Sequence, residues 1–281
     1  MSEAVIEIHN LKKTFRDFWF RPVANAVNGI DLRIERGDVF GLLGPNGSGK
    51  STTIKMILGL LKPTDGTIRL FGEPPQSKNA RKRIGYLPEL SYLHPFLTAW
   101  ETLRYYADLS GMSAKEGKRR CDELLEQVGL TYVANRPVGG FSKGMARRVA
   151  LASSLVSNPE LLILDEPTSG LDPIGTREVK EMILDLAKKG VTILMTSHLL
   201  GDSEDVCTKL AILSKGKVAA FGNTDELLVK RDDVRFTVPN LSAEESEEIS
   251  KYISSKFNRE VKIDHPRVPL EEFFAATVNP N

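Results

Sequence analysis

The chain has 281 residues, enough for one large or two modest domains with a buried core. Its 38 Lys and Arg residues nearly balance its 37 Asp and Glu residues, so the net charge of +1 gives no electrostatic ground for a nucleic-acid partner. The cysteines Cys121 and Cys207 form neither a disulfide framework nor a metal-binding spacing, and no stretch approaches the roughly 18 uninterrupted apolar residues of a membrane span.

The first predicted elements are strands that lead into a glycine-rich loop. Residues 5–8 and 30–34 alternate between apolar and polar side chains, which predicts two strands, and the apolar run 39–43 predicts a buried one. Residues 44–52 follow with the sequence Gly-Pro-Asn-Gly-Ser-Gly-Lys-Ser-Thr, which fits the phosphate-loop pattern G-x-x-x-x-G-K-[ST]. A helix is predicted to about Leu60, so the loop has the strand before it and the helix after it that the motif requires.

The residue types in this loop suit the binding of phosphate groups. Glycines at 44, 47 and 49 let the backbone turn its N–H groups into one concavity, and the helix that begins near Lys50 adds the positive end of its dipole. Lys50 supplies a charge for the outer phosphates, and the Ser51 hydroxyl suits Mg²⁺. We therefore predict binding of a nucleoside triphosphate. The predicted contact residues are Gly44, Pro45, Asn46, Gly47, Ser48, Gly49, Lys50, Ser51 and Thr52.

The middle of the chain is predicted to be mainly helical. Turn residues at 61–66 precede a strand over residues 67–71. Between residues 98 and 129, apolar side chains recur at three- and four-residue spacing, and a further helix is predicted over residues 143–156. These helices indicate a helical subdomain at about residues 90–160.

The following segment alternates between strands and helices. A strand over 161–164, a helix over 176–188 and a strand over 191–196 predict a β-α-β unit and hence a parallel sheet. Residues 210–213 and 217–221 predict a hairpin.

The composition changes after residue 233. The predicted elements there are a strand over 234–238, an acidic helix over 243–256, a strand over 260–263 and a short helix over 270–278. We therefore predict a main domain over residues 1–232 and a small α+β appendix over residues 233–281.

Two predicted strands end in side chains suited to phosphate chemistry. Ligands of open α/β sheets lie at the carboxyl ends of the strands, so Asp165 and Glu166 should come close to the phosphates. Asp165 suits the coordination shell of Mg²⁺, and Glu166 suits polarisation of an attacking water. His198 follows the next strand and can hydrogen-bond the γ-phosphate, although by itself it also fits a loop histidine with local partners.

Several of these motifs, in this order, resemble those of the ATPase subunit of ATP-binding-cassette (ABC) transporters. They are Asp-Glu-Pro-Thr-Ser-Gly-Leu-Asp at 165–172, Thr-Ser-His at 196–198 and Phe-Ser-Lys-Gly-Met at 141–145, in the place of the usual Leu-Ser-Gly-Gly-Gln signature. The resemblance covers about residues 5–225. It implies an α/β P-loop NTPase with a mixed or parallel sheet, an N-terminal antiparallel β subdomain and a helical signature subdomain. It also implies an ATPase that uses ATP and Mg²⁺.

The resemblance further implies a head-to-tail dimer, in which each ATP lies between one subunit's phosphate loop and the other's signature segment. Ser142, Lys143 and Gly144 would then contact nucleotide in trans, and Asp172 would communicate across the interface. Ser142 and Gly144 open a predicted helix, so a hydroxyl and free N–H groups can reach a phosphate, with a plain helix N-cap as the local alternative. Lys143 stands where the first glycine of the pair is usual.

Residues 84–89 match the family's loop that contacts Mg²⁺ and the membrane subunit, with Glu89 in place of the usual glutamine. A carboxylate keeps an oxygen ligand for Mg²⁺ but adds charge, so we predict a tuned rather than an inactive site. Residues 92–97 fall where the family docks a coupling helix of its membrane partner, although local packing explains their aromatic side chains equally well.

The adenine contact is open. The family places an aromatic ring after the first strand, and Phe15 fits that position. Because residues 16–22 are inserted there, Phe18, Trp19 and Phe20 are alternatives, and this aromatic cluster could also pack locally or against a partner.

Together these observations predict an ATP-hydrolysing subunit that powers an ABC transporter. The partners implied are a second copy or a similar ATPase subunit, and transmembrane permease subunits on separate chains. The expected location is the cytoplasmic face of the plasma or inner membrane, with membrane contact only through the permease. The Glu89 loop and the Lys-Gly-Met signature resemble exporters of drugs, lipids or polysaccharides; an importer ATPase, a non-hydrolysing regulatory subunit and a soluble ABC ATPase are the alternatives.

Overall fold

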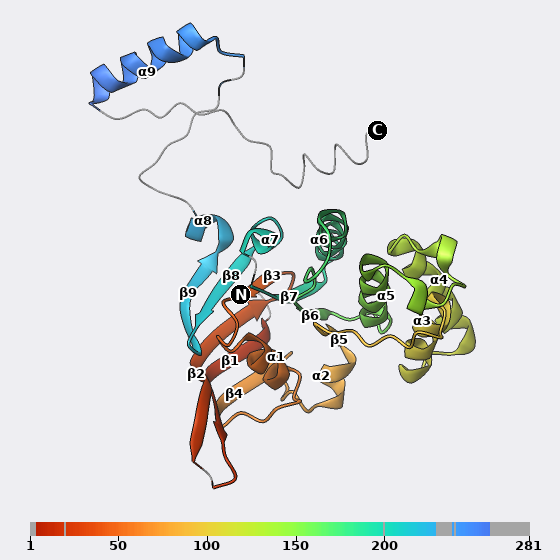
Figure 1. Ribbon diagram of the computed structural model, residues 1–281. Helices are drawn as coiled ribbons and strands as arrows, with labels where there is room; N and C mark the ends of the chain where they lie inside the picture. Colours follow the sequence, from red (N-terminus) through yellow and green to blue (C-terminus); the bar gives the residue numbers. More distant parts are fainter. Residues whose placement is uncertain (1–3, 20, 199, 229–237, 239, 259–281) are drawn as a thin grey trace. The chain divides into compact units, whose positions relative to one another are not determined.

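The computed structural model describes residues 4–19, 21–198, 200–228, 238 and 240–258, and Figure 1 shows their arrangement. The chain divides into two compact units, Met1–Leu227 and Leu228–Asn281. The predicted boundary at residue 232 falls among residues 229–237, outside the described part, so it stays a prediction.

The first unit contains a small antiparallel sheet with the strand order β2-β1-β4. Its strands are β1 (Ala4–Arg16), β2 (Pro22–Glu35) and β4 (Asp65–Leu70). This sheet is the antiparallel β subdomain that the sequence predicted.

The second sheet has six strands in the order β5-β6-β7-β3-β8-β9. They are β3 (Val39–Leu43), β5 (Ile84–Leu87), β6 (Leu161–Asp165), β7 (Thr192–Ser197), β8 (Lys209–Ser214) and β9 (Lys217–Asn223). Neighbouring strands are parallel from β5 to β8, and β9 pairs antiparallel with β8. The mixed α/β sheet is therefore confirmed.

Both faces of the six-stranded sheet are covered, which explains why β3, β6 and β7 are apolar or buried throughout. In β3, Val39 and Leu43 pack with the buried residues of the helices, whereas Phe40 and Leu42 pack with those of β1, β2 and the helix α1 (Lys50–Ile57). This alternation between two hydrophobic clusters fixes β3 in the centre of the fold.

Three helices make a lobe at one side of the sheet, seen on the right in Figure 1: α3 (Ala99–Leu109), α4 (Ala114–Gln127) and α5 (Lys143–Leu155). Capping boxes at Thr98 and Ser113 start α3 and α4, so the predicted helical stretch is two helices. The other helices of this unit are α2 (Lys78–Lys82), α6 (Pro173–Lys188), α7 (Leu200–Glu204) and α8 (Thr224–Leu228), which crosses the division between the units.

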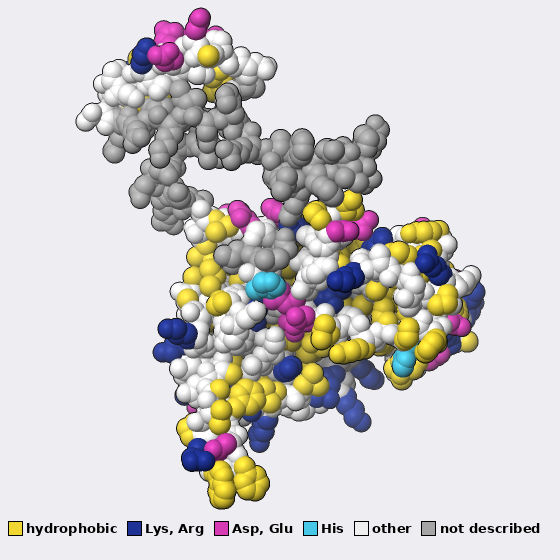
Figure 2. Space-filling model, in the orientation of Figure 1, with side chains coloured by type: hydrophobic (Ala, Val, Ile, Leu, Met, Phe, Trp, Pro, Cys, Tyr) yellow, Lys and Arg dark blue, Asp and Glu magenta, His cyan; other side chains and the backbone are white. Residues whose placement is uncertain are grey.

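The β1–β2 hairpin is longer than predicted and projects from the body of the unit (Figure 1). Its outer half leaves the core, so its residues are not forced to alternate, and the sequence pattern is weak there. At the turn, Asp17 accepts hydrogen bonds from the backbone N–H groups of Trp19 and Arg21. Figure 2 shows hydrophobic side chains at this tip, where Phe18 is 89% and Trp19 72% exposed.

The prediction that residues 84–89 form a loop was partly wrong. Residues 84–87 form β5, the edge strand that pairs with β6, and the loop begins only at Pro88. The segment is too short for alternation to mark it as a strand, and its pairing with β6 is non-local.

In the second unit the structure describes one helix, α9 (Ala243–Phe257), which begins with a capping box formed by Ser242 and Glu245. The helix predicted over 243–256 is thus confirmed. The strand predicted over 260–263 and the helix over 270–278 lie outside the described residues, as does most of the strand predicted over 234–238. No helix in the described ranges is long and apolar enough to cross a membrane.

Candidate active site

The loop after β3 and the residues after β6 and β7 meet at one edge of the parallel sheet. Leu43 pairs with Ser197, and Asp165 pairs with Thr196, so the three strands end side by side. A cavity of about 260 Å³ lies there. It is lined by Ala26, Asn46, Gly47, Gly49, Lys50, Ser51, Thr52, Glu89, Glu166 and His198.

The glycines of the loop are required by close backbone approaches. Gly44 and Gly49 have φ angles of 150° and 108°, in the region that favours glycine. A Cβ at Gly44 would lie 2.3 Å from the carbonyl oxygen of Leu213, and a Cβ at Gly49 would lie 2.5 Å from that of Ala26. The loop is therefore fixed against β2 and β8.

The polar atoms of the loop suit a bound oxyanion. The Nζ atom of Lys50 is buried and donates to the carbonyl oxygens of Gly44, at 2.6 Å, and Pro45, at 3.3 Å. The hydroxyl oxygen of Ser48 is buried and has no hydrogen-bond partner among the residues described. Because a buried polar atom without a partner is costly, the Ser48 hydroxyl favours a bound ligand or water here.

Glu166 lies where the three strands converge. Its Oε1 atom is 3.8 Å from Lys50 Nζ, and its Oε2 atom is 2.8 Å from His198 Nδ1. The side chain is 9% exposed, and the backbone is left-handed with φ of 49°. For a residue other than glycine this conformation costs roughly 1 kcal/mol, and such strain is typical of functional sites.

A single hydroxyl joins Asp165 to Glu166. Thr196 donates its hydroxyl hydrogen to Asp165 Oδ1 at 2.6 Å, and it accepts the backbone N–H of Glu166 at 3.0 Å. The strand β7 therefore fixes both acidic residues at the end of β6.

The donor set fits a Mg²⁺ ion that is shared with a nucleotide. In the part of the chain that the structure describes, no three His, Cys, Asp or Glu side chains are grouped to hold a metal by themselves. Mg²⁺ usually takes one or two carboxylates and fills its shell with phosphate and water oxygens. Ser51 and Glu89 line the cavity, and Asp165 directly precedes Glu166, which also lines it.

The predicted signature residues do not line this cavity within one chain. Ser142 is the N-cap of α5, and its hydroxyl accepts the backbone N–H of Met145 at 3.2 Å, which is the local alternative. Lys143 and Gly144 open the same helix. Asp172 is the N-cap of α6, where its Oδ1 accepts the backbone N–H of Gly175 at 2.7 Å.

None of the candidate adenine rings that the structure describes lines the cavity either. Phe15 is 40% exposed and pairs with Ala24, two residues before the cavity residue Ala26. Phe18 and Trp19 lie further out at the hairpin tip, in an edge-to-face pair with ring centroids 5.7 Å apart. Phe20 lies outside the described residues.

Sequence analysis did not single out Arg147, a buried residue of α5. Its guanidinium donates to backbone oxygens of residues 88–89 and of residues 165–167. Burial lowers the pKa of Arg147, while the charges of Asp165, Glu89 and Tyr86 act in the opposite direction. The spacing of apolar residues along the helix could have predicted that Arg147 faces inward, but it could not have predicted which residues Arg147 contacts.

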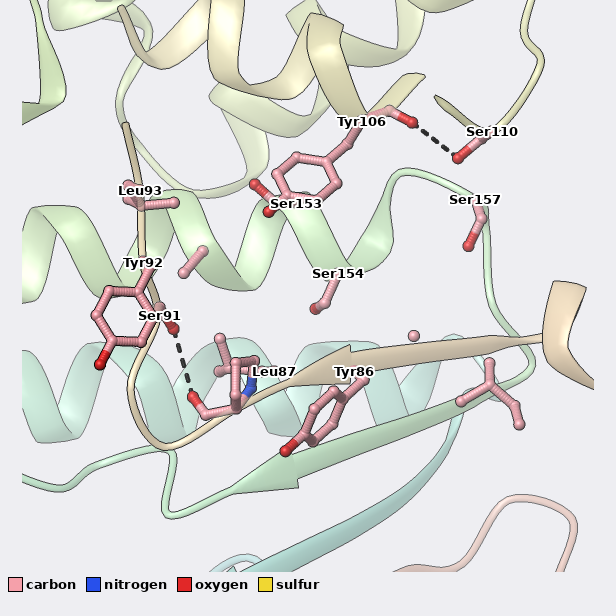
Figure 3. A pocket seen from close by; sticks show the side chains of 14 residues that line it. Tyr86, Leu87, Ser91, Tyr92, Leu93, Tyr106, Ser110, Ser153, Ser154 and Ser157 are labelled. Carbon is pink, nitrogen blue, oxygen red and sulfur yellow. Dashed lines mark hydrogen bonds between the residues drawn. The ribbon is translucent and has the colours of Figure 1, made fainter. Parts of the chain in front are cut away.

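A second cavity of about 240 Å³ lies between β5 and the helical lobe. Figure 3 shows Tyr86, Ser91 and Tyr92 on one side of it, and Ser153, Ser154 and Tyr106 on the other. The segment that follows β5 has exposed apolar side chains at Leu90, Tyr92 and Phe96, which are 67%, 87% and 88% exposed, and Tyr92 lines the cavity.

The chain is similar to several known proteins in sequence and fold. The chain matches a family model described as ABC transporter over residues 27–169. It is 41% identical over 228 residues to an uncharacterized ABC transporter ATP-binding protein from Nostoc sp., which is 80% of this chain and 68% of that protein. Over 230 residues it is 40% identical to a Nod factor export ATP-binding protein I from Burkholderia orbicola, which is 81% of this chain and 74% of that protein. A dimeric ATP-binding cassette in a post-hydrolysis state, bound to ADP and Pi, has a TM-score of 0.70 and 26% identity, covering 78% of this chain and 98% of that one.

Proposed function

The chain belongs to the ABC transporter family of ATP-binding proteins and is an ATPase of that family, and on this premise we propose that it hydrolyses ATP as a head-to-tail dimer to power export through separate permease subunits. The observation that carries the proposal is the convergence of Lys50, Glu166 and His198 on the cavity beside the phosphate loop.

In the proposed mechanism, the loop of residues 44–52 binds the phosphates of ATP. Lys50 exchanges its two carbonyl partners for the outer phosphates, and the Ser48 hydroxyl gains a partner. Mg²⁺, held by Ser51, Glu89 and Asp165, would offset the negative charge of the phosphates. Glu89 adds a negative charge to this site, so binding of the phosphates depends on the positive charges of Lys50 and Mg²⁺.

Glu166 is the proposed general base. Its carboxylate is almost fully buried and has one oxygen near Lys50 and the other on His198. A base held between two nitrogen groups has a fixed orientation, so it can accept a proton from a water aligned with the γ-phosphate. His198 orients the carboxylate through Nδ1 and offers its other nitrogen to the γ-phosphate.

The second half of each site comes from the partner copy. Ser142, Lys143 and Gly144 open α5, a 13-residue helix whose dipole and free N–H groups suit a phosphate. In one chain they lie away from the cavity, which a head-to-tail dimer explains. Asp172 would act across the same interface. The dimeric neighbour with ADP and Pi supports this arrangement.

Phe15 is the proposed adenine contact, because the register places it closer to Ala26 than Phe18 or Trp19. The membrane partner is proposed to dock at the second cavity and at residues 90–96, which include the exposed aromatic side chains of Tyr92 and Phe96. The chain would then sit on the cytoplasmic face of the membrane. Export is supported by the Nod factor export relatives and by the exporter-like residues Glu89 and Lys143.

The experiment is phosphate release from the purified chain combined with its permease in lipid vesicles. The wild type should release phosphate from ATP, and Glu166→Gln should bind ATP without releasing phosphate. Equal inactivity of both proteins, with ATP bound by both, would overturn the hydrolytic function. Accumulation of cargo inside inside-out vesicles on addition of ATP tests export, since an importer would empty them.

A further inference from the structure

Arg147 is 7% exposed and lies between two segments of the proposed active site. One amino group, Nη1, donates to the carbonyl oxygens of Pro88, at 2.7 Å, and Glu89, at 3.0 Å, and to the Ser91 hydroxyl, at 3.0 Å. This amino group therefore binds the loop that follows β5.

The other nitrogen atoms of the guanidinium bind the end of β6 and the two residues that follow it. The Nη2 atom donates to the carbonyl oxygens of Asp165, at 3.0 Å, and Glu166, at 2.8 Å, and Nε donates to that of Pro167, at 2.9 Å. The five N–H donors of one planar group thus hold two segments that are more than 70 residues apart in the chain. Lysine, with three donors on one nitrogen, cannot reproduce this fork.

The two segments have different tasks. Pro88 and Ser91 line the second cavity, the proposed docking groove of the permease, whereas Glu166 is the proposed base. We propose that Arg147 is a positioning residue that holds Glu166 in its catalytic place and couples it to occupation of the docking groove. This inference rests on the proposed function.

The helix α5 adds a third connection. Lys143 stands one helical turn before Arg147, at the end of α5 that is proposed to bind nucleotide on the partner copy. A displacement of α5 on nucleotide binding would therefore reach both segments through the same guanidinium.

The nature of the contacts defines a specific signature. Arg147 touches the backbone of Asp165 and Glu166 and not their carboxylates. Its loss should shift the position of the base, which lowers kcat, while the phosphate loop and hence the KM for ATP stay as they are.

Arg148 provides the matched control, since it is the next residue of the same helix. Its Nη1 donates to the Val128 carbonyl at 3.2 Å, and its Nε lies 3.6 Å from Glu178 Oε2. These partners belong to the helical lobe and α6, and none belongs to the two segments held by Arg147. Arg148→Gln therefore removes an equal charge from α5 without releasing either segment.

The experiment compares Arg147→Gln, Arg147→Lys and Arg148→Gln in the full chain, alone and with the permease in vesicles. We expect Arg147→Gln to lower kcat about tenfold to a hundredfold, to change KM less than about twofold and to abolish stimulation by the permease. Arg147→Lys should recover little, and Arg148→Gln should keep the stimulation.

Two results would overturn the inference. One is a folded Arg147→Gln or Arg147→Lys protein, with wild-type ATP affinity, that is still stimulated by the permease. The other is an equal loss of stimulation in Arg148→Gln. Absence of hydrolysis by the wild-type complex would instead overturn the proposed function, and this inference with it.

Discussion

The Nδ1 atom of His198 lies 2.8 Å from Oε2 of Glu166, so the residue that follows β7 orients the acid that follows β6. The other oxygen of the same carboxylate lies 3.8 Å from Nζ of Lys50. The two carboxylate oxygens of Glu166 thus have different partners, and together these contacts fix the orientation of the side chain. His198 therefore fixes the orientation of the proposed base, in addition to its proposed contact with phosphate.

His198→Ala should lower kcat about a hundredfold, because Glu166 loses its orienting partner and the γ-phosphate loses a donor. Binding of ATP should change little, since the loop of residues 44–52 is untouched. Phosphate-release kinetics and ATP titration measure the two effects. The matched control is His9→Ala on the exposed surface of β1, which should leave both unchanged. A kcat near the wild-type value in His198→Ala would contradict this role.

A partly exposed ion network at the other end of the sheet should make stability depend on pH. Glu160 accepts hydrogen bonds from Arg83 Nε at 2.6 Å and from Arg36 Nη1 at 2.8 Å, and these donors lower its pKa to about 2. The contribution to the free energy of unfolding is present above the unfolded pKa of about 4.3 and is lost as the pH falls towards about 2. Since the Glu160 side chain is 39% exposed, solvent screening keeps the contribution near about 1 kcal/mol.

Glu160→Gln should therefore be less stable at neutral pH and should lose less further stability between about pH 5 and pH 3. Urea unfolding at several pH values measures both differences. The control is Glu123→Gln, which removes the exposed ion pair between Glu123 and Arg119 in α4. This variant should follow the wild-type curve. Parallel curves for Glu160→Gln and the wild type would show that this network does not govern the acid range.

Both cysteines should resist thiol reagents in the folded protein. Burial raises the pKa of Cys121 to about 11 and that of Cys207 to about 12, so the reactive thiolate is scarce at about pH 8. Labelling with a chromogenic disulfide should be slow in the native state and immediate in denaturant. Ser255→Cys on exposed α9 is the positive control, and rapid native labelling of the two natural cysteines would contradict the burial described here.

The order of motifs along the chain predicted which strands carry the site, because a phosphate loop and acidic strand ends have strong local signals. Lys50, Glu166 and His198 come together as expected, since parallel strands end at one edge of the sheet. The strand β5 was missed because four residues show too little periodicity and its pairing with β6 spans a long stretch of chain.

Arg147 was missed for a related reason. Its partners are backbone oxygens of residues 88–89 and 165–167, and backbone acceptors leave no mark in the sequence. A buried arginine on a helix can be expected from spacing, but its partners follow only from the packing of α5 against two other segments. The same limit applies to Ser142, whose N-cap contact is local, whereas its proposed contact with nucleotide needs a second chain.

The proposed sharing of each site between two copies can be tested by mixing inactive proteins. Lys50→Met should inactivate the phosphate loop, and Gly144→Glu should inactivate the signature segment by placing a negative charge next to ATP. The Gly144 substitution should leave the fold intact, because a Cβ there would meet its nearest atom, Ser142 Oγ, at 4.0 Å. Each protein alone should be inactive. A dimer of the two different variants has one site made of two wild-type halves, so mixing them should restore ATP hydrolysis. The control mixes the wild type with a chain that carries both substitutions, and the mixed dimer then has no intact site. If each site formed within one chain, the mixture of the two single variants would contain no intact site and would stay inactive, whereas the wild-type chains in the other mixture would keep their full activity.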